Sequence, residues 1–206
     1  MPKETVQPSR VDLARGKEKE SQIRIRILSP ENPRDLEIAR FYDEKTLDAL
    51  NPEDESHDLM TEEALKRWLV DTDKQCLRSI EGEDGTPLGF AYYYRNRSRS
   101  FLARIAEIRR RTKIPKNQSI WEMNFCMVVD AVDEVVQQGV GRTLKDFSKK
   151  FKRETAVVMF AEADERTQDN IVLESLGFRS AGPINYDIDG QVDSDAYVGL
   201  LAPNKQ

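Results

Sequence analysis

One short stretch of the chain has residue types that suit the binding of an anion. An apolar, strand-forming run at residues 121–129 is followed by Gln137-Gln138-Gly139-Val140-Gly141-Arg142, which opens an amphipathic segment. Glycines at the point where a loop enters a helix leave backbone N–H groups unpaired, and the helix dipole favours negative charge there. The pattern therefore predicts that this loop holds the phosphate groups of a cofactor.

Other motifs that carry chemistry are absent from the sequence. The chain has one histidine, His57, within an acidic loop, and its two cysteines, Cys76 and Cys126, lie fifty positions apart. These residues argue against a metal site and against a Ser-His-acid triad. Position 144 is Leu144, so the third glycine of the dinucleotide fingerprint is missing, and no glycine is followed by Lys-Ser/Thr. We therefore expect no metal and no dinucleotide.

The overall composition indicates a globular protein with a modest acidic charge. Of the 206 residues, 38% are hydrophobic and 33% are charged, and the net charge is −5. The acidic total argues against nucleic acid as the main partner. No apolar run approaches the roughly 20 residues that span a bilayer, and the N-terminus lacks the apolar core of a signal peptide. We therefore expect a cytoplasmic protein without a membrane partner.

The hydrophobic pattern predicts seven strands and five helices. The predicted strands are residues 22–28, 74–80, 88–94, 121–129, 155–161, 178–188 and 196–201. The predicted helices are residues 34–42, a segment capped by Thr61, part of a basic segment, 140–152 and 167–176. The strands at 74–80 and 88–94 flank a turn and form a hairpin. The strand, helix and strand between residues 121 and 161 form a parallel βαβ unit.

The chain divides into a tail, one domain and a basic insertion. Residues 1–21 hold few large apolar residues and are predicted to form a disordered tail, followed by one domain at 22–206. Residues 95–119 are predicted to be an insertion between strands, because 95–116 contain nine Lys and Arg residues against Glu107 alone. Four interpretations of this insertion stay open: a solvated basic helix, docking on acidic loops, a homodimer contact, or contact with nucleic acid.

The element order and two motifs resemble the GCN5-related N-acetyltransferase family over roughly residues 22–201. Gln137-Gln138-Gly139-Val140-Gly141-Arg142-Thr143-Leu144 is similar to the family's Arg/Gln-x-x-Gly-x-Gly/Ala loop. Val172-Leu173-Glu174-Ser175-Leu176-Gly177-Phe178 is similar to its helix that ends in Leu-Gly-Phe. The resemblance implies an α/β (α+β) fold: a mixed, mostly antiparallel sheet of about seven strands, flanked by helices, with one parallel βαβ unit that carries the cofactor loop.

The resemblance also implies that acetyl-CoA is the co-substrate and that an acetyl group moves to a primary amine. The pyrophosphate would rest on the backbone of the glycine loop, and the pantetheine would run beside the end of the preceding strand. The residues that the resemblance places at acetyl-CoA are Met127, Val128, Val129, Gln137, Gln138, Gly139, Val140, Gly141, Arg142, Thr143 and Asn170.

The sequence departs from the family pattern at three places. Val136 stands where the family has a polar residue, and no proline precedes the loop. Leu173 stands where the family often has a tyrosine that reprotonates the CoA thiolate. Arg166 stands where the family has an asparagine, and Asn170, one helical turn later, is a substitute on the same face.

Three residues are candidates for acid–base chemistry. An acceptor ammonium must lose a proton before direct attack on the thioester, so the reaction needs a general base. Glu122 and Glu162 occupy places where family members carry acids, and each lies beside an apolar run in which desolvation raises a carboxyl pKa. Tyr186 lies in Asn185-Tyr186-Asp187, which is similar to the family's Asn-Tyr-Tyr, and is a candidate acid or acceptor contact.

The acceptor is predicted from charge. The loops at residues 51–58 and 187–195 are strongly acidic, which favours a cationic acceptor such as a polyamine, an aminoglycoside, or a peptide or protein amine. A non-catalytic acyl-CoA-binding regulatory module of the same fold is the alternative, because the family's tyrosine is missing.

Overall fold

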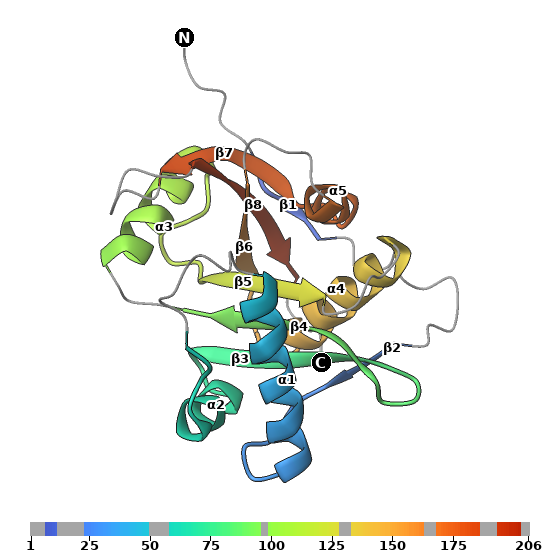
Figure 1. Cartoon of the computed structure of the whole chain (residues 1–206). Coiled ribbons are helices and arrows are strands. Elements are labelled where there is room, and N and C mark those ends of the chain that lie inside the picture. Colours follow the sequence, from blue (N-terminus) through green and yellow to red (C-terminus); the bar gives the residue numbers. More distant parts are fainter. Residues whose placement is uncertain are drawn as a thin grey trace.

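The structure, a computed structural model, describes residues 7–11, 23–49, 58–95, 99–127, 133–162, 168–185 and 193–202. Within these ranges the chain forms one sheet of eight strands flanked by five helices (Figure 1). The strands are β1 (Ser9–Arg10), β2 (Ile23–Arg26), β3 (Gln75–Gly82), β4 (Pro87–Tyr94), β5 (Ile120–Met127), β6 (Thr155–Glu162), β7 (Arg179–Asn185) and β8 (Asp193–Leu201). The helices are α1 (Pro33–Ala49), α2 (Glu62–Leu69), α3 (Arg99–Arg111), α4 (Asp133–Ser148) and α5 (Gln168–Ser175). In the described ranges, none of the helices has the length and apolar character needed to cross a membrane.

The sheet is mixed, as the sequence predicted. The strands lie in the order β1-β8-β6-β5-β4-β3-β2, and β7 also pairs with β8. β5 and β6 are parallel, as are β1 and β8, whereas the other pairs are antiparallel. The β5–α4–β6 segment is thus the predicted βαβ unit, and β3 and β4 form the predicted hairpin. The mixed, mostly antiparallel α/β fold is confirmed.

Helices cover both faces of the sheet. Successive side chains of a strand point to opposite faces, so in β5 Ile120 packs in the apolar cluster beneath α3, whereas Trp121 and Met123 pack in the cluster beneath α4 and α5. α1 and α2 pack over β3 and β4 on the same face as α3. Figure 1 shows α1 crossing in front of the sheet. The even-numbered side chains of β5 therefore lie on the face that carries α1, α2 and α3.

Several predicted elements have the bounds that their sequence signals indicate. Thr61 is the N-cap of α2, and its Oγ1 accepts a 3.2 Å hydrogen bond from the backbone N–H of Ala64. Gly177 follows α5 and has a φ of 93°. Glycine adopts this left-handed backbone conformation with little strain, which is why it commonly ends a helix. The basic segment contains a helix, α3, as its apolar spacing predicted. That residues 95–119 are an insertion into a domain at 22–206 stays a prediction.

The predicted start of the helix after β5 is wrong. α4 begins at Asp133 and not near residue 140, and it ends at Ser148. Val136, Val140, Leu144 and Phe147 recur at helical spacing and are all buried against the sheet. Burial of this stripe outweighs the cost of two interior glycines, which is about 1 kcal/mol each. The two glycines therefore lie inside a helix.

The prediction of a disordered tail over residues 1–21 is wrong at residues 7–11. Ser9 and Arg10 form β1, which pairs with Gly199 and Leu200 of β8 and makes an eighth strand where seven were expected. Val11 is buried, and its backbone N–H donates to the Leu200 carbonyl at 2.9 Å. Pairing with an existing edge lets a segment with a single large apolar residue form a strand, a contact that local composition does not reveal.

Candidate active site

A wedge opens between the two parallel strands at the centre of the sheet. The β5–β6 ladder contains Ile120, Trp121 and Glu122, whose partners are Ala156, Val157 and Val158. Beyond this point β5 continues to pair with β4 as far as Met127, and β6 continues to pair with β8 as far as Glu162. In the described part of the chain, no ladder pair joins the C-terminal halves of β5 and β6. Their facing backbone edges can therefore accept an extended ligand, as the edge of a sheet accepts a strand.

Glu122 lies where the wedge begins. Its side chain is buried, although it carries a carboxylate, and it lies on the α3 face of the sheet. One carboxylate oxygen, Oε1, accepts a 2.5 Å hydrogen bond from the hydroxyl of Tyr94 on β4. The other, Oε2, lies 3.5 Å from Nη2 of Arg104 on α3. A carboxylate offers about four lone-pair sites, so these two contacts leave capacity for a further proton donor.

The surroundings of Glu122 change its acidity in a direction that suits a base. Desolvation raises the pKa of Glu122, while the hydrogen bond from Tyr94 and the charge of Arg104 act in the opposite direction without cancelling it. Burial also raises the pKa of Tyr94, so its hydroxyl keeps its proton near neutral pH and acts as a donor. Glu122 can therefore take a proton from a bound ammonium more readily than an exposed carboxylate can.

Sequence reasoning missed Tyr94 and Arg104. The signal for Tyr94 was the Tyr92-Tyr93-Tyr94 run at the end of a predicted strand, since strand alternation places Tyr92 and Tyr94 on one face. Tyr92 and Tyr94 stack with ring centroids 5.3 Å apart, and Trp68 of α2 meets Tyr92 edge-on at 6.0 Å. The row of aromatic rings leads from α2 to the carboxylate. Arg104 had no signal of its own among the arginines of the basic segment.

The glycines of the predicted loop are packing residues in the structure. An added Cβ at Gly139 would lie 3.2 Å from Cγ2 of Ile80 on β3. At Gly141 an added Cβ would lie 3.4 Å from Cδ2 of Leu176, which follows α5. The two glycines thus let α4 approach the sheet on one side and the α5 segment on the other. Their amides lie past the first turn of α4, where helical N–H groups bond to the preceding turn.

The other residues predicted to contact the cofactor along α4 face the protein interior or neighbouring segments. Val140 is buried in the core, and Thr143 accepts a 2.9 Å hydrogen bond from the buried hydroxyl of Tyr93. Gln137 donates from Nε2 to Oγ of Ser175 at 2.7 Å. Arg142 donates to the carbonyl of Ile23 on β2, and Gln138 is half-buried. These contacts belong to the fold, and residues 137–142 lie inside α4 and not in a loop. That these residues contact acetyl-CoA stays a prediction.

The free donors of α4 are in its first turn, at residues 133–136. This turn comes after β5 in the chain, at the open end of the wedge. An extended ligand that lies along β5 would continue toward it. By sequence, the first two positions of the helix are Asp133 and Glu134. Negative charge at the first positions of a helix disfavours an anion there, so from the sequence we expect these two acids to weaken its binding.

The remaining predicted site residues are placed only in part. Met127 ends β5 and is partly buried against the α4 core. Glu162 ends β6, on the other side of the wedge, opposite Ser194 of β8. Val128, Val129 and Tyr186 lie outside the described residues, and for Asn170 the structure describes only a backbone position in α5. Residues 51–57 of the first acidic loop and residues 187–192 of the second lie outside them as well.

Comparison with solved structures finds proteins that share the fold of this chain. No protein-family model matches the chain, and no curated protein matches it. A GCN5-related N-acetyltransferase from Kribbella flavida is 18% identical with a TM-score of 0.56, over 86% of this chain and 96% of that one. A ribosomal-protein-S5-alanine acetyltransferase from Vibrio fischeri is 11% identical with a TM-score of 0.55, over 91% and 97%.

A third solved structure is a ribosomal L7/L12 alpha-N-protein acetyltransferase in complex with coenzyme A. It is 10% identical with a TM-score of 0.57, and the match covers 88% of this chain and 96% of that one. At these identities the likeness concerns the fold, and the chain spans nearly the whole length of each of these structures.

Proposed function

We propose, on the premise that the chain has the fold of the GCN5-related N-acetyltransferases, that it transfers an acetyl group from acetyl-CoA to a primary amine. The observation that carries the proposal is the position of a buried carboxylate, Glu122, at the point where β5 and β6 part. A ligand laid along the wedge would bring its inner end to this carboxylate. Two of the structural neighbours named above are acetyltransferases of ribosomal proteins by name, which supports an amine acceptor.

The residues of the wedge fit acetyl-CoA in two respects. The facing edges of Met123–Met127 and Met159–Glu162 offer backbone groups to the amides of an extended pantetheine arm. The first turn of α4 offers N–H groups to a diphosphate. When bound, acetyl-CoA supplies a thioester, an acyl group activated toward attack by an amine.

Glu122 acts as the general base in the proposed reaction. The acceptor enters as an ammonium and gives one proton to the carboxylate of Glu122, and its free lone pair then attacks the thioester carbonyl carbon. The carbon–nitrogen bond forms and the carbon–sulfur bond breaks. The second nitrogen proton goes to the departing sulfur, which leaves as the free thiol of CoA, and Glu122 releases the first proton to solvent. Tyr94 and Arg104 hold the two oxygens of Glu122, so the carboxylate is oriented before the acceptor arrives.

The test is acetyl-CoA turnover by the purified chain with a mixed panel of primary amines. Free thiol is followed in time, and the acetylated amine is identified by mass. We expect thiol release that depends on the amine, with one acetyl added for each thiol. Binding of acetyl-CoA in a calorimeter without thiol release on any amine of the panel would contradict the proposal.

A further inference from the structure

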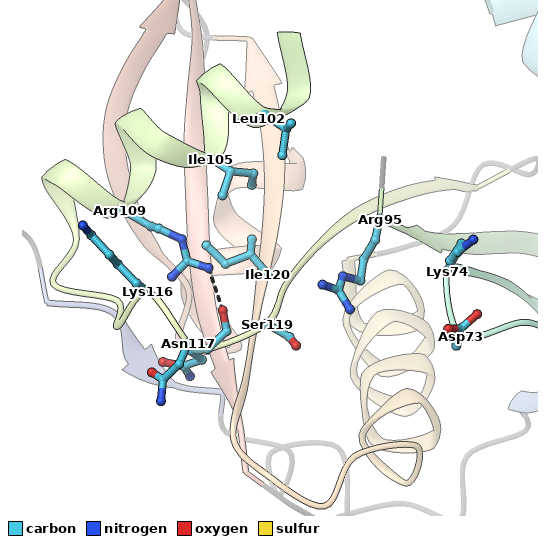
Figure 2. A pocket seen from close by; sticks show the side chains of 11 residues that line it. Asp73, Lys74, Arg95, Leu102, Ile105, Arg109, Lys116, Asn117, Ser119 and Ile120 are labelled. Atoms are coloured by element: carbon cyan, nitrogen blue, oxygen red, sulfur yellow. Dashed lines mark hydrogen bonds between the residues drawn. The ribbon is translucent and has the colours of Figure 1, made fainter. Parts of the chain in front are cut away.

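A cavity of about 380 Å³ lies beside the proposed active site, between α3 and the ends of β3, β4 and β5 (Figure 2). Figure 2 shows Leu102 and Ile105 of α3 facing Ile120 of β5, which gives the cavity an apolar wall. Its polar lining is dominated by four basic side chains, against one carboxylate, that of Asp73. The basic residues are Lys74, Arg95, Arg109 and Lys116.

These four cations lack acidic partners within the described residues. Three other arginines of α3, Arg104, Arg110 and Arg111, form ion pairs with glutamates, whereas none of the four basic side chains of the cavity does. Lys74, Arg95 and Lys116 are exposed. The cavity therefore holds positive charge that the described residues do not neutralise.

Arg109 and Arg95 are held in place by contacts other than ion pairs. The guanidinium of Arg109 donates to the carbonyls of Pro115 and Gln118, the latter at 2.6 Å. Burial lowers the pKa of Arg109, since no acid compensates for the lost hydration. Cζ of Arg95 lies over the ring of Trp121, 5.8 Å from its centroid. The guanidinium of Arg109 is thus positioned before any ligand binds, whereas that of Arg95 lies with Trp121 on the α4 face of the sheet, opposite α3.

The cavity and Glu122 share the same three structural elements. Ile120 lines the cavity, and Glu122 is the next residue of β5 on the same face of the sheet. Arg95 directly follows Tyr94, whose hydroxyl bonds Glu122. On α3, Arg104 reaches Glu122 from between Leu102 and Ile105, which line the cavity. A ligand in the cavity is therefore a near neighbour of the carboxylate.

We propose that this cavity binds an anionic group, a carboxylate or a phosphate, that the acceptor carries beside its reactive amine. The proposal rests on the proposed function, in which the amine lies at Glu122. Lys and Arg side chains bind carboxylates and phosphates by charge-assisted hydrogen bonds, and the apolar wall fits the carbon skeleton that joins the anion to the amine. A polycation meets the like charges of Lys74, Arg109 and Lys116 around this cavity, so the charges described here select against it.

The first experiment measures binding without turnover. The C-terminally amidated tripeptides Ala-Glu-Glu, Ala-Gln-Gln and Ala-Lys-Lys, together with O-phosphoethanolamine and ethanolamine, are titrated in a calorimeter at low salt. We expect at least one anionic amine to bind about tenfold or more tightly than its neutral analogue, which is a modest ratio for two added charge-assisted contacts. Preference for the peptide or for the phosphate identifies the carrier of the anion. Equal binding of anionic and neutral members of both pairs would overturn the proposal.

The second experiment locates the binding. The double variant Lys74→Glu, Lys116→Glu reverses two exposed charges of the cavity, and Lys113→Glu makes the same change at an exposed lysine outside it. We expect the double variant to lose the preference for the anionic amine, as a higher KM with little change in kcat, while Lys113→Glu stays within about twofold. An unchanged preference in the double variant, or an equal loss in the control, would refute the site.

The two proposals fail in distinguishable ways. If neutral or cationic amines are acetylated as well as anionic ones, the acetyltransferase proposal stands and the anion site falls. If an anionic amine binds, loses affinity in the double variant and yet is never acetylated, the anion site stands and the acetyltransferase proposal falls.

Discussion

The hydroxyl of Tyr94 donates a 2.5 Å hydrogen bond to Oε1 of Glu122, its cross-strand partner in the β4–β5 ladder. Directly opposite residues of an antiparallel pair have Cβ atoms about 5 Å apart on one face, so the strand register itself brings the two side chains together. Arg104 reaches the other oxygen of Glu122 from α3. The carboxylate is therefore oriented from two sides by groups that belong to separate elements.

The variant Glu122→Gln tests the base directly. We expect kcat to fall by about 10²- to 10⁴-fold, the usual contribution of a positioned general base. Desolvation raises the pKa of Glu122, so in the wild type kcat/KM rises with pH as this carboxyl loses its proton. That rising limb should be missing in the variant. Glu154→Gln, at the residue before β6 whose carboxylate pairs with Arg10, is the matched control. A wild-type pH profile in Glu122→Gln would exclude the role.

The variant Tyr94→Phe tests the orientation of the base. The hydrogen bond from Tyr94 lowers the pKa of Glu122, so its removal raises that pKa further. The rising limb of the pH–rate profile should therefore move to higher pH. Tyr92→Phe is the control, because its hydroxyl bonds Gln75 at 3.1 Å and not the carboxylate. A shift of the same size in both variants would show that the hydroxyl of Tyr94 has no specific effect.

The glycines of α4 give a test of the packing interpretation. Gly141→Ala should raise the free energy of unfolding by about 0.5–1 kcal/mol, because alanine is the better helix former and its Cβ meets Leu176 at 3.4 Å. Gly139→Ala should give a smaller increase in the free energy of unfolding than Gly141→Ala, or a decrease, because the added Cβ would lie 3.2 Å from the buried side chain of Ile80. Urea denaturation measures both values. Acetyl-CoA affinity should stay within about twofold in Gly141→Ala, whereas a large loss would restore the loop as the anion site.

The first turn of α4 gives a complementary test by calorimetry. Neutralisation of its two acids, with Asp133→Asn and Glu134→Gln together, should tighten acetyl-CoA binding about three- to tenfold, because helix-terminal charges contribute about 0.3–1 kcal/mol each. Glu62→Gln with Glu63→Gln removes the same two charges from the first turn of α2 and controls for net charge. Equal effects of the two double variants would locate the diphosphate elsewhere.

Asp146 gives a prediction for stability against pH. Burial opposes its ionisation, but hydrogen bonds from Lys149 and from Arg78, at 2.6 Å, outweigh burial and hold the pKa of Asp146 below its ordinary value. The charged form therefore stabilises the fold above the pKa of the unfolded chain, and this contribution is lost as pH falls through the folded pKa. Asp146→Asn should lower the free energy of unfolding by about 1–2 kcal/mol near neutral pH. It should also flatten the loss of stability on acidification, and an equally steep loss would contradict the assignment.

The sequence was sufficient for the fold because the apolar runs are long and regular. The seven predicted strands and the helices α2, α3 and α5 lie close to their predicted places, whereas α1 extends past its predicted end to Ala49. The parallel β5–β6 pair follows from its connection. The start of α4 was misjudged because glycines are strong local signals, while the stripe that begins at Val136 gains its energy only against the sheet. β1 was missed for a related reason, since its partner lies far away in the chain, at Gly199.

The candidate site was predicted only in part, because its geometry depends on register. Glu122 was found as a carboxylate beside an apolar run, and the structure adds the burial that raises its pKa. Its partners come from β4 and α3, and no local pattern in the sequence states which tyrosine faces it. The basic cavity was likewise predicted only in part. Its cations between residues 95 and 116 form a charged run in the sequence, but Lys74 lies near them only because the strands of the sheet pair.

The short strand β1 also protects the molecule from its own copies. β8 is paired with β6 along one edge, while β7 covers its other edge from Asp193 to Val198 and β1 covers Gly199 and Leu200. Gly199 leaves room for Val11, since an added Cβ there would lie 2.6 Å from the valine side chain. Proteolytic trimming through residue 11 would leave two backbone positions of a hydrophobic strand open to a neighbouring chain. Edge-to-edge aggregation, rather than unfolding, is then the expected failure of a trimmed preparation.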